Sequence, residues 1–308
     1  MDIFSIILII FGLCLFEIIS SIDNAIINAE VLSTMQPRFR RWFLLWGILF
    51  AVFVVRGILP LILIWAATPS LTPWEVFTAM FTDSPEVKEA IETSAPMLLI
   101  GGGIFLIFLF LHWIFLEKKE YGLKGERYIE SKGVWFFAIV SLLLAVIVWY
   151  ALDKNPFMAF GAVVGSSAFF IVHGFRQNAE AQEQRLIGGN MSDISKIFYL
   201  EVIDATFSID GVLGAFAFTF LVPLILVGNA LGAIVVRQLT VSNIDRIKRY
   251  RYLKNGAMYS IMFLGCIMIV DAFGVHIPTF ASPLITFGVV GFFFFKSIKD
   301  PQYTQSAS

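Results

Sequence analysis

Long apolar stretches separated by short polar segments are the main pattern of this sequence. A helix needs about 20 apolar residues to cross the hydrocarbon core of a membrane. Nine stretches of about this kind occur, at residues 3–29, 42–66, 97–116, 134–152, 155–173, 197–219, 220–239, 253–273 and 279–295. The chain lacks the alternating pattern of membrane β-strands, so its backbone must bond internally as helices. We predict an all-α polytopic membrane protein with about nine transmembrane helices in a single domain, residues 1–308.

The composition supports a membrane protein over a soluble one. Hydrophobic residues make up 58% of the 308, charged residues only 15%, and the mean hydropathy is +0.82. Soluble domains carry about 25% charged residues. The segment Met1-Asp2-Ile3 lacks the basic residues of a secretory signal, so we expect the first apolar stretch to be retained as an anchor. The net charge of −1 gives no indication of nucleic-acid binding.

Small residues inside the spans are expected to serve helix packing. Cys14 and Cys266 lie in different spans without metal-ligand spacing, which favours packing over a disulfide or a site. The pairs Gly161/Gly165 and Gly228/Gly232 have the spacing of close helix contacts. The run 101–103 of three glycines predicts either the same packing or a kink.

The basic residues give the orientation of the bundle. Eighteen of the 22 Lys and Arg residues fall in the odd-numbered loops and the C-terminal tail, whereas the even-numbered loops hold only Lys88 and Lys154. Basic loops face the cytoplasm. We therefore expect a multi-pass protein of the plasma (inner) membrane, with the N-terminus outside and the C-terminus in the cytoplasm.

One long outer connection, about 67–96, is acidic. Ser84-Pro85 predicts the start of a helix there, with a capping serine followed by proline in the first turn. The acids could attract cations or could simply be solvated, and the role of the segment stays open.

A short acidic motif occurs twice. In both copies an acid is followed by a serine four residues later and by an aspartate two residues after that. The copies are Glu17, Ser21 and Asp23 in the first span, and Asp204, Ser208 and Asp210 in the sixth.

An arginine-ended segment follows each copy. Residues 51–56, ending at Arg56, resemble residues 232–237, ending at Arg237. The two motifs lie in the first and the sixth predicted span. Because these spans are an odd number of crossings apart, they cross the membrane in opposite directions, as in the inverted repeats of transporters. We predict a first repeat at about 1–116, linking helices at about 117–195 and a second repeat at about 196–295.

Carboxylates inside a membrane are expensive, and this chain has five near the middle of the two motif-bearing spans. Each costs at least about 2.5–3.5 kcal/mol on insertion scales. A bound cation, protonation, or pairing with Arg56 or Arg237 could compensate them. The five are Glu17, Asp23, Glu201, Asp204 and Asp210.

Helical spacing favours one shared site. Glu17, Ser21 and Asn24 lie on one helix face, and so do Glu201, Asp204 and Ser208. Asp23 and Asp210 lie about 120° off these faces, so they join the site only if the helix breaks. Glycines at 211 and 214 would permit a break in the second copy, whereas the first copy has no glycine there.

The ligand chemistry favours a hard divalent cation. Carboxylates, an amide and hydroxyls form an all-oxygen set suited to Mn²⁺, Ca²⁺ or Mg²⁺, and no Cys or His cluster supports zinc or copper. We expect the cation, Mn²⁺ or Ca²⁺, to be the transported or bound ion, with no cofactor required. The expected partners are the lipid bilayer and this metal ion, with a homo-oligomer left open.

At these residues the chain resembles the TerC family, within the superfamily of LysE-type exporters. Ser21-Ile22-Asp23-Asn24 is similar to the family's first acidic motif, Glu201-xx-Asp204-xx-Phe207-Ser208-x-Asp210 to its second, and Asn229 through Arg237 to the following helix. The resemblance implies export of manganese or related metals, with a link to tellurite resistance in some members. It implies site roles for Glu17, Asp23, Asn24, Glu201, Asp204 and Asp210, with Asn229 in support. This chain has Asp210-Gly211-Val212-Leu213-Gly214 where the family commonly continues Asp-Ser-Ile-Pro-Ala.

Other functions remain open. The acids could bind the ammonium group of an organic cation or amino acid, or the protein could serve membrane assembly or metal delivery without transport. An intramembrane aspartic protease would also need two acids on adjacent helices. Its usual Gly-x-Gly-Asp context is absent before Asp210, so we predict a protein that is not an enzyme.

Overall fold

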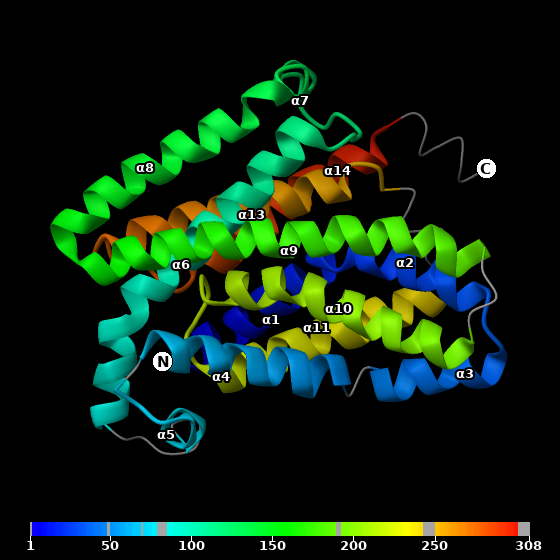
Figure 1. Ribbon diagram of the computed structural model, residues 1–308, viewed down its shortest axis with the longest axis horizontal. Coiled ribbons are helices and arrows are strands. Elements are labelled where there is room, and N and C mark those ends of the chain that lie inside the picture. Colours follow the sequence, from blue (N-terminus) through cyan, green and yellow to red (C-terminus); the bar gives the residue numbers. More distant parts are fainter. Residues whose placement is uncertain are drawn as a thin grey trace.

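The computed structural model describes residues 2–47, 50–68, 70–78, 85–188, 192–242 and 250–300, and every regular element in these ranges is a helix (Figure 1). The segments η1 and η2 are π-helical and η3 is a 3-10 turn. The elements are α1 (Ile3–Ser20), α2 (Ile22–Ser33), α3 (Pro37–Trp42), η1 (Phe43–Gly47), η2 (Phe50–Val55), α4 (Arg56–Ala67), α5 (Pro73–Thr78), α6 (Pro85–Leu116), α7 (Glu126–Glu130), η3 (Gly133–Trp135), α8 (Phe136–Lys154), α9 (Pro156–Gly188), α10 (Asp193–Ala215), α11 (Val222–Ser242), α13 (Leu253–Ala272) and α14 (Ala281–Ile298).

Six of the described helices are long and apolar enough to cross a membrane, which makes this a multi-pass membrane protein by length and composition. Large apolar side chains also cover their outer surfaces. On α8, Phe137, Leu142 and Trp149 are 63%, 67% and 70% exposed, as expected of a lipid-facing helix. The six segments are Ile3–Ser20, Glu89–Leu116, Gly133–Lys154, Pro156–Asn178, Leu253–Ala272 and Ala281–Ile298.

The other three expected spans are helical where the structure describes them, but they differ from the six. Helix α10 carries Glu201, Asp204 and Asp210, too many acids for an ordinary apolar span. Helix α4 and the apolar part of α11, Val222–Gln238, are apolar but shorter. The stretch 42–66 is divided among the end of α3, η1, η2 and α4.

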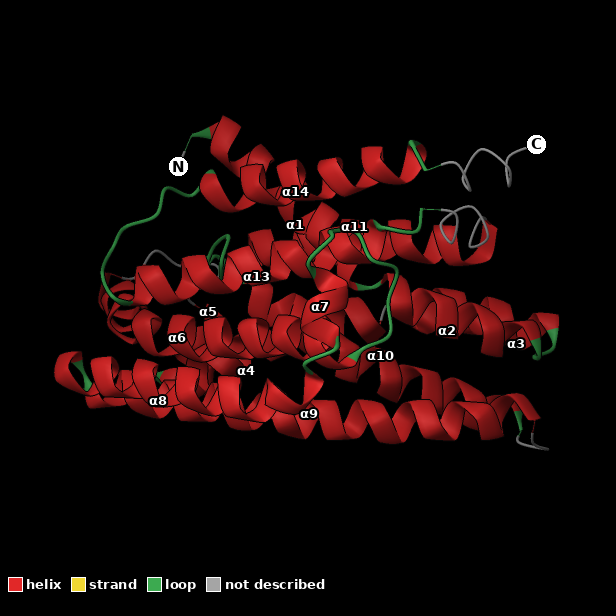
Figure 2. Cartoon of the chain, turned by 90° about the horizontal axis from the view of Figure 1, so that it is seen from above, coloured by secondary structure: helices red, strands yellow, loops and turns green. Residues whose placement is uncertain are grey.

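Helix α6 lies at the centre of the bundle. It packs against α13 on one side and α9 on another, and α8 covers α9 (Figures 1 and 2). Ile100, Ile104 and Trp113 of α6 are fully buried. Helix α1 packs between α11 and α14. This arrangement brings α1 beside α10 and α11, although they are nearly 200 residues apart in the sequence.

Glycines set the closest helix contacts, as their spacing predicted. A Cβ atom at Gly228 would lie 2.5 Å from Leu13 Cβ, and one at Gly232 would lie 2.5 Å from Glu17 Cβ. The backbones of α11 and α1 can therefore approach only because these positions lack side chains. A Cβ at Gly161 would likewise lie 2.6 Å from the carbonyl oxygen of Met97 on α6. The 101–103 run also serves packing, since a Cβ atom at Gly101 would lie 2.8 Å from the carbonyl oxygen of Gly161 and one at Gly103 would lie 2.9 Å from that of Gly265. Cys14 and Cys266 are free.

The helix is interrupted in the first copy of the acidic motif and not in the second copy, where two glycines would permit a break. The first motif is divided at Ser21, between α1 and α2, whereas α10 runs through Gly211 and Gly214 without interruption. The two glycines that would permit a break in the second copy are therefore not used for one. A glycine lowers the cost of a break but does not impose one when the helix can keep its internal hydrogen bonds. Gly211 instead faces Glu17, since a Cβ there would lie 3.0 Å from Glu17 Oε2.

Candidate functional site

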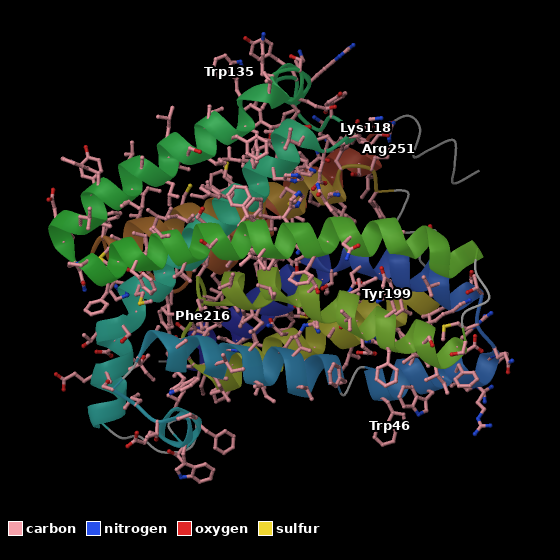
Figure 3. All side chains as sticks on the ribbon, viewed as in Figure 1. Trp46, Lys118, Trp135, Tyr199, Phe216 and Arg251 are labelled. Carbon is pink, nitrogen blue, oxygen red and sulfur yellow. The ribbon has the colours of Figure 1, made fainter. Side chains whose placement is uncertain are left out.

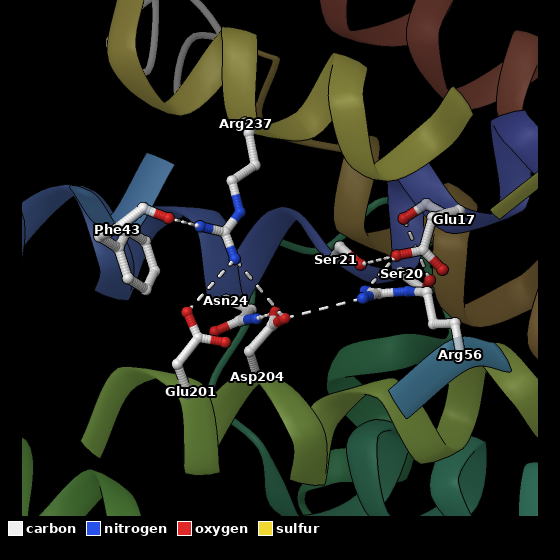
Figure 4. A network of polar contacts seen from close by, with 9 residues as sticks. All are labelled: Glu17, Ser20, Ser21, Asn24, Phe43, Arg56, Glu201, Asp204 and Arg237. Carbon is white, nitrogen blue, oxygen red and sulfur yellow. Dashed lines mark hydrogen bonds and ion pairs between the residues drawn. The ribbon is translucent and has the colours of Figure 1, made fainter. Parts of the chain in front are cut away.

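The two acidic motifs meet inside the bundle (Figure 4). On the first, Ser21 Oγ donates a hydrogen bond of 2.8 Å to Glu17 Oε1. One turn further on, Asn24 Nδ2 donates to Asp204 Oδ1 of α10. Glu17, Asn24 and Asp204 are 1%, 2% and 6% exposed. The structure therefore brings together residues that helical spacing had assigned to one site.

Arg56 links the two motifs. It is the first residue of α4, and its guanidinium lies 2.5 Å from Glu17 Oε1 and 3.6 Å from Asp204 Oδ2. The Arg56 side chain is only 4% exposed. One arginine thus neutralises an acid from each copy of the motif.

Arg237 of α11 performs a similar role on the other side of Asp204. Its Nη2 atom lies 3.8 Å from Glu201 Oε1 and 3.9 Å from Asp204 Oδ2. Its Nη1 atom donates a 2.9 Å hydrogen bond to the carbonyl of Phe43, and the guanidinium stacks over the Phe43 ring at 4.2 Å. These contacts fix Arg237 in place, and Asp204 lies between two guanidinium groups (Figure 4).

Asp210 does not join this cluster directly. It is buried and forms an ion pair with Arg176 of α9. The span predicted at 155–173 places Arg176 in the loop that follows it. That end was wrong: α9 continues to Gly188, and Arg176 lies inside it with a side chain only 13% exposed. Hydropathy ends a span at the first polar residues and cannot detect a helix that continues beyond them.

Asp23 lies in α2, but the position of its side chain is outside the described part of the structure. Ser208 and Asn229 are 3% and 0% exposed. Neither has a side-chain hydrogen bond to any described residue.

Several buried side-chain oxygens of α2, α10 and α11 have no hydrogen-bond partner among the described residues. Both carboxylate oxygens of Glu201 lack a hydrogen bond, although Oε1 lies 3.8 Å from Arg237 Nη2. Asn28 lies one helical turn beyond Asn24 and is 6% exposed. Buried acceptors normally have partners, so these atoms mark a site that can accept a further donor, a water or a cation. The side-chain oxygens are those of Asn24, Asn28, Glu201, Ser208, Asp210 and Asn229.

A glycine missed by sequence reasoning makes room for the cluster. A Cβ atom at Gly47, in η1, would collide with Glu201 Oε1 and would lie 2.7 Å from Arg237 Nη1. Nothing in the local sequence distinguishes this glycine from one in an ordinary apolar span. Only the position of η1 against α10 and α11 reveals its role.

The arrangement is an arginine-neutralised acid cluster rather than a closed metal centre. Among the described side chains, no three His, Cys, Asp or Glu residues converge closely enough to hold a metal ion. The reason is geometric, because Arg56 and Arg237 occupy the space between the carboxylates.

The chain belongs to a protein family described as "Protein of unknown function (DUF475)", whose model matches residues 22–303. The match includes Asp23 of the first acidic motif but not Glu17 or Ser21, and it includes the whole second motif and the three arginines that pair with these acids. No curated protein and no solved structure matches the chain.

Proposed function

We propose that this protein is a transporter of the plasma membrane that exports a divalent metal cation, Mn²⁺ foremost, through the buried acid cluster. The observation that carries the proposal is the group of buried oxygens without hydrogen-bond partners on residues of the arginine-bridged cluster, those of Asn24 and Glu201. An all-oxygen set of carboxylates and amides suits hard cations. The resemblance of both motifs to those of TerC proteins points in the same direction.

The arginines define what transport requires of this site. A cation cannot bind between Glu17 and Asp204 while the Arg56 guanidinium lies 2.5 Å from one and 3.6 Å from the other. In the proposal, the arginine-paired arrangement is the resting state, and cation entry displaces one or both guanidinium groups. When the cation leaves, the guanidinium groups return to the carboxylates, so these acids are not left unpaired inside the membrane. This exchange limits the free-energy cost of releasing the cation.

The π-helical segment next to Arg56 offers a way to move it. Arg56 follows η2 (Phe50–Val55) directly. π-Helical turns are less regular than α-helix and often occur at functional sites. Conversion of η2 to α-helix would shift its register and rotate Arg56 about the helix axis, away from the acids.

The topology in the proposal is that of nine spans with an inverted repeat, an external N-terminus and a cytoplasmic C-terminus. Its support is the meeting of the α1–α2 motif with the α10 motif, each followed in the chain by an arginine that reaches the cluster. Sites at the interface of inverted repeats are a feature of secondary transporters.

Flux through reconstituted protein tests the proposal. We expect radioactive Mn²⁺ uptake into proteoliposomes by the wild-type chain, and at least about a tenfold loss in Asp204→Asn and Glu17→Gln, because each removes an anionic ligand. Asp153→Asn is the matched control, since Asp153 is an exposed acid at the end of α8. Absence of flux in the wild type, or equal flux in Asp204→Asn and Asp153→Asn, would refute the proposal.

An organic cation is the second candidate substrate. The acids already bind two guanidinium groups of the chain itself, so their spacing fits planar nitrogen cations as well as metal ions. A basic amino acid that competes with Mn²⁺, or that is carried when Mn²⁺ is not, would identify this alternative.

A further inference from the structure

A cavity of about 420 Å³ lies where α6 ends and α13 begins, and no residue of the acid cluster lines it. Its lining comes from the loop after α6 and from residues around the start of α13. Figure 3 shows Lys118 and Arg251, two of its residues, at the same end of the molecule. The lining residues are Trp113, Lys118, Lys119, Glu120, Arg251, Lys254 and Asn255.

We infer that this cavity binds a phosphate group, either on an anionic lipid headgroup or on a soluble phosphate compound. Its lining presents four cationic side chains and a single carboxylate. Lysine and arginine only donate hydrogen bonds, and phosphate oxygens only accept them. The inference does not depend on cation transport by the acid cluster.

The cavity is held in shape by contacts of its own. Lys119 Nζ donates hydrogen bonds of 2.8 Å to the carbonyls of Trp113 and Glu117, and it lies 5.1 Å above the Trp113 ring. Asn255 Nδ2 donates to the carbonyl of Glu120 and to Glu126 Oε2, both at 3.0 Å. These bonds clamp the loop after α6 onto α13, so the cations are positioned before a ligand arrives.

Acids pair with three of the four cations: Lys119 lies 3.4 Å from Glu130, and Arg251 lies 3.8 Å from Asp300 as well as beside Glu120. Lys254 lies 3.0 Å from Glu117, and Arg251 pairs with Glu120. Burial would raise the pKa of Glu117, but His112 Nδ1 at 3.4 Å and the charge of Lys254 at 3.0 Å lower it to about 2, so Glu117 stays anionic. Glu120 is 55% exposed, and such exposed pairs contribute little and exchange readily. A phosphate can therefore replace Glu120 beside Arg251.

A buried donor gives independent evidence of a ligand. Trp113 is fully buried and lines the cavity, yet its indole N–H has no hydrogen-bond partner among the described residues. A buried N–H of this kind is normally satisfied. In the proposal, the side chains that cover the buried indole shift and a phosphate oxygen accepts from its N–H, whereas a cationic ligand could not accept.

The position of the cavity makes a lipid headgroup a natural source of the phosphate. Two of the membrane-spanning segments, Glu89–Leu116 and Leu253–Ala272, end and begin beside it. The cavity therefore lies at the depth of the headgroups, where basic pockets bind anionic lipids.

Binding measurements on the purified full chain test this inference. In neutral detergent, inorganic phosphate is titrated and the melting temperature recorded. In nanodiscs, retention of phosphatidylglycerol over phosphatidylcholine is measured by native mass spectrometry. The variants are Lys118→Gln, which removes an exposed cation, and Trp113→Phe, which removes the indole N–H but keeps an aromatic ring. Lys124→Gln is the matched control, because Lys124 is an exposed lysine of the same loop that does not line the cavity.

We expect Lys118→Gln and Trp113→Phe to weaken binding about tenfold each, which corresponds to the loss of one hydrogen bond to a charged group. Lys124→Gln should bind as the wild type does. Stabilisation by inorganic phosphate identifies a soluble ligand, and selective retention of phosphatidylglycerol alone identifies a lipid. The inference is overturned if the wild type binds neither, or if Lys124→Gln loses as much affinity as Lys118→Gln.

Discussion

Replacement of Arg56 by glutamine offers the sharpest test of the buried cluster. The substitution keeps a polar side chain of similar length but removes the charge that faces Glu17 and Asp204. Both acids then remain in a site where they are 1% and 6% exposed. Asp204 keeps Arg237 at 3.9 Å, but Glu17 has no second cationic partner among the described residues.

The magnitude follows from the distances. At an effective dielectric constant of about 20, the attraction of Arg56 to Glu17 at 2.5 Å is about 7 kcal/mol, and to Asp204 at 3.6 Å about 5 kcal/mol. Desolvation of the three charges offsets most of this in the wild type. Removing Arg56 leaves the carboxylates buried without this partner, and the loss of one member of a buried ion pair typically lowers the free energy of unfolding by about 3–5 kcal/mol. We expect Arg56→Gln to lower the free energy of unfolding by that amount.

A double-mutant cycle separates this effect from a general loss of packing. Unfolding is followed in detergent with a metal chelator present, for the wild type, Arg56→Gln, Glu17→Gln and the double variant. The double variant removes both charges, so it should be more stable than the sum of the single effects by about 2 kcal/mol or more. The exposed pair of Arg251 and Glu120 is the control, and its coupling should be about 0–1 kcal/mol.

Additivity of Arg56→Gln and Glu17→Gln within about 0.5 kcal/mol would refute the reasoning, because independent sites behave in that way. The same variant bears on transport. If Arg56 competes with the cation, Arg56→Gln should bind Mn²⁺ more tightly than the wild type. Weaker Mn²⁺ binding would contradict competition between Arg56 and the cation, but it would not contradict the ion pair between Arg56 and Glu17 in the wild type.

Two further predictions concern packing and pH. Gly232→Ala places a Cβ atom 2.5 Å from Glu17 Cβ and 2.8 Å from the Cys14 carbonyl oxygen, so it should lower the free energy of unfolding by about 1–3 kcal/mol. The control is Gly288→Ala, where no atom lies within 4 Å of the added Cβ, and it should be neutral or stabilising in the same thermal unfolding assay. Burial raises the pKa of Glu117, but His112 at 3.4 Å and the charge of Lys254 outweigh it and lower the pKa from 4.5 to about 2. The ionised form of Glu117 therefore stabilises the fold above about pH 4.5, and this contribution is lost as the pH falls toward about 2. The stability difference between the wild type and Glu117→Gln should therefore be constant from pH 5 to 7 and shrink below pH 4.5, and a difference that stays unchanged down to about pH 3 would contradict the depressed pKa.

Much of the fold was accessible from the sequence because lipid leaves the backbone few choices. A long apolar stretch in a membrane must be a helix, so residues 134–152, 253–273 and 279–295 were located nearly to their ends. The packing role of Gly228 and Gly232 also followed from spacing alone. The extent of α9 did not follow, because polar residues such as Arg176 end a hydropathy signal without ending a helix.

The acidic residues of the candidate site could be predicted from the sequence, but the arginine that pairs with each of them could not. The cost of a buried carboxylate singles out Glu17, Glu201, Asp204 and Asp210 in any apolar span, and helical periodicity places Glu17 with Asn24 on one face. The sequence by itself therefore determined which residues need compensation. Only the tertiary structure decided what compensates them: Arg56 and Arg237 for the central cluster, and Arg176 for Asp210. The physical reason is that a charge pair depends on distances of a few ångströms between helices far apart in the chain, and these distances are set by how the whole bundle packs.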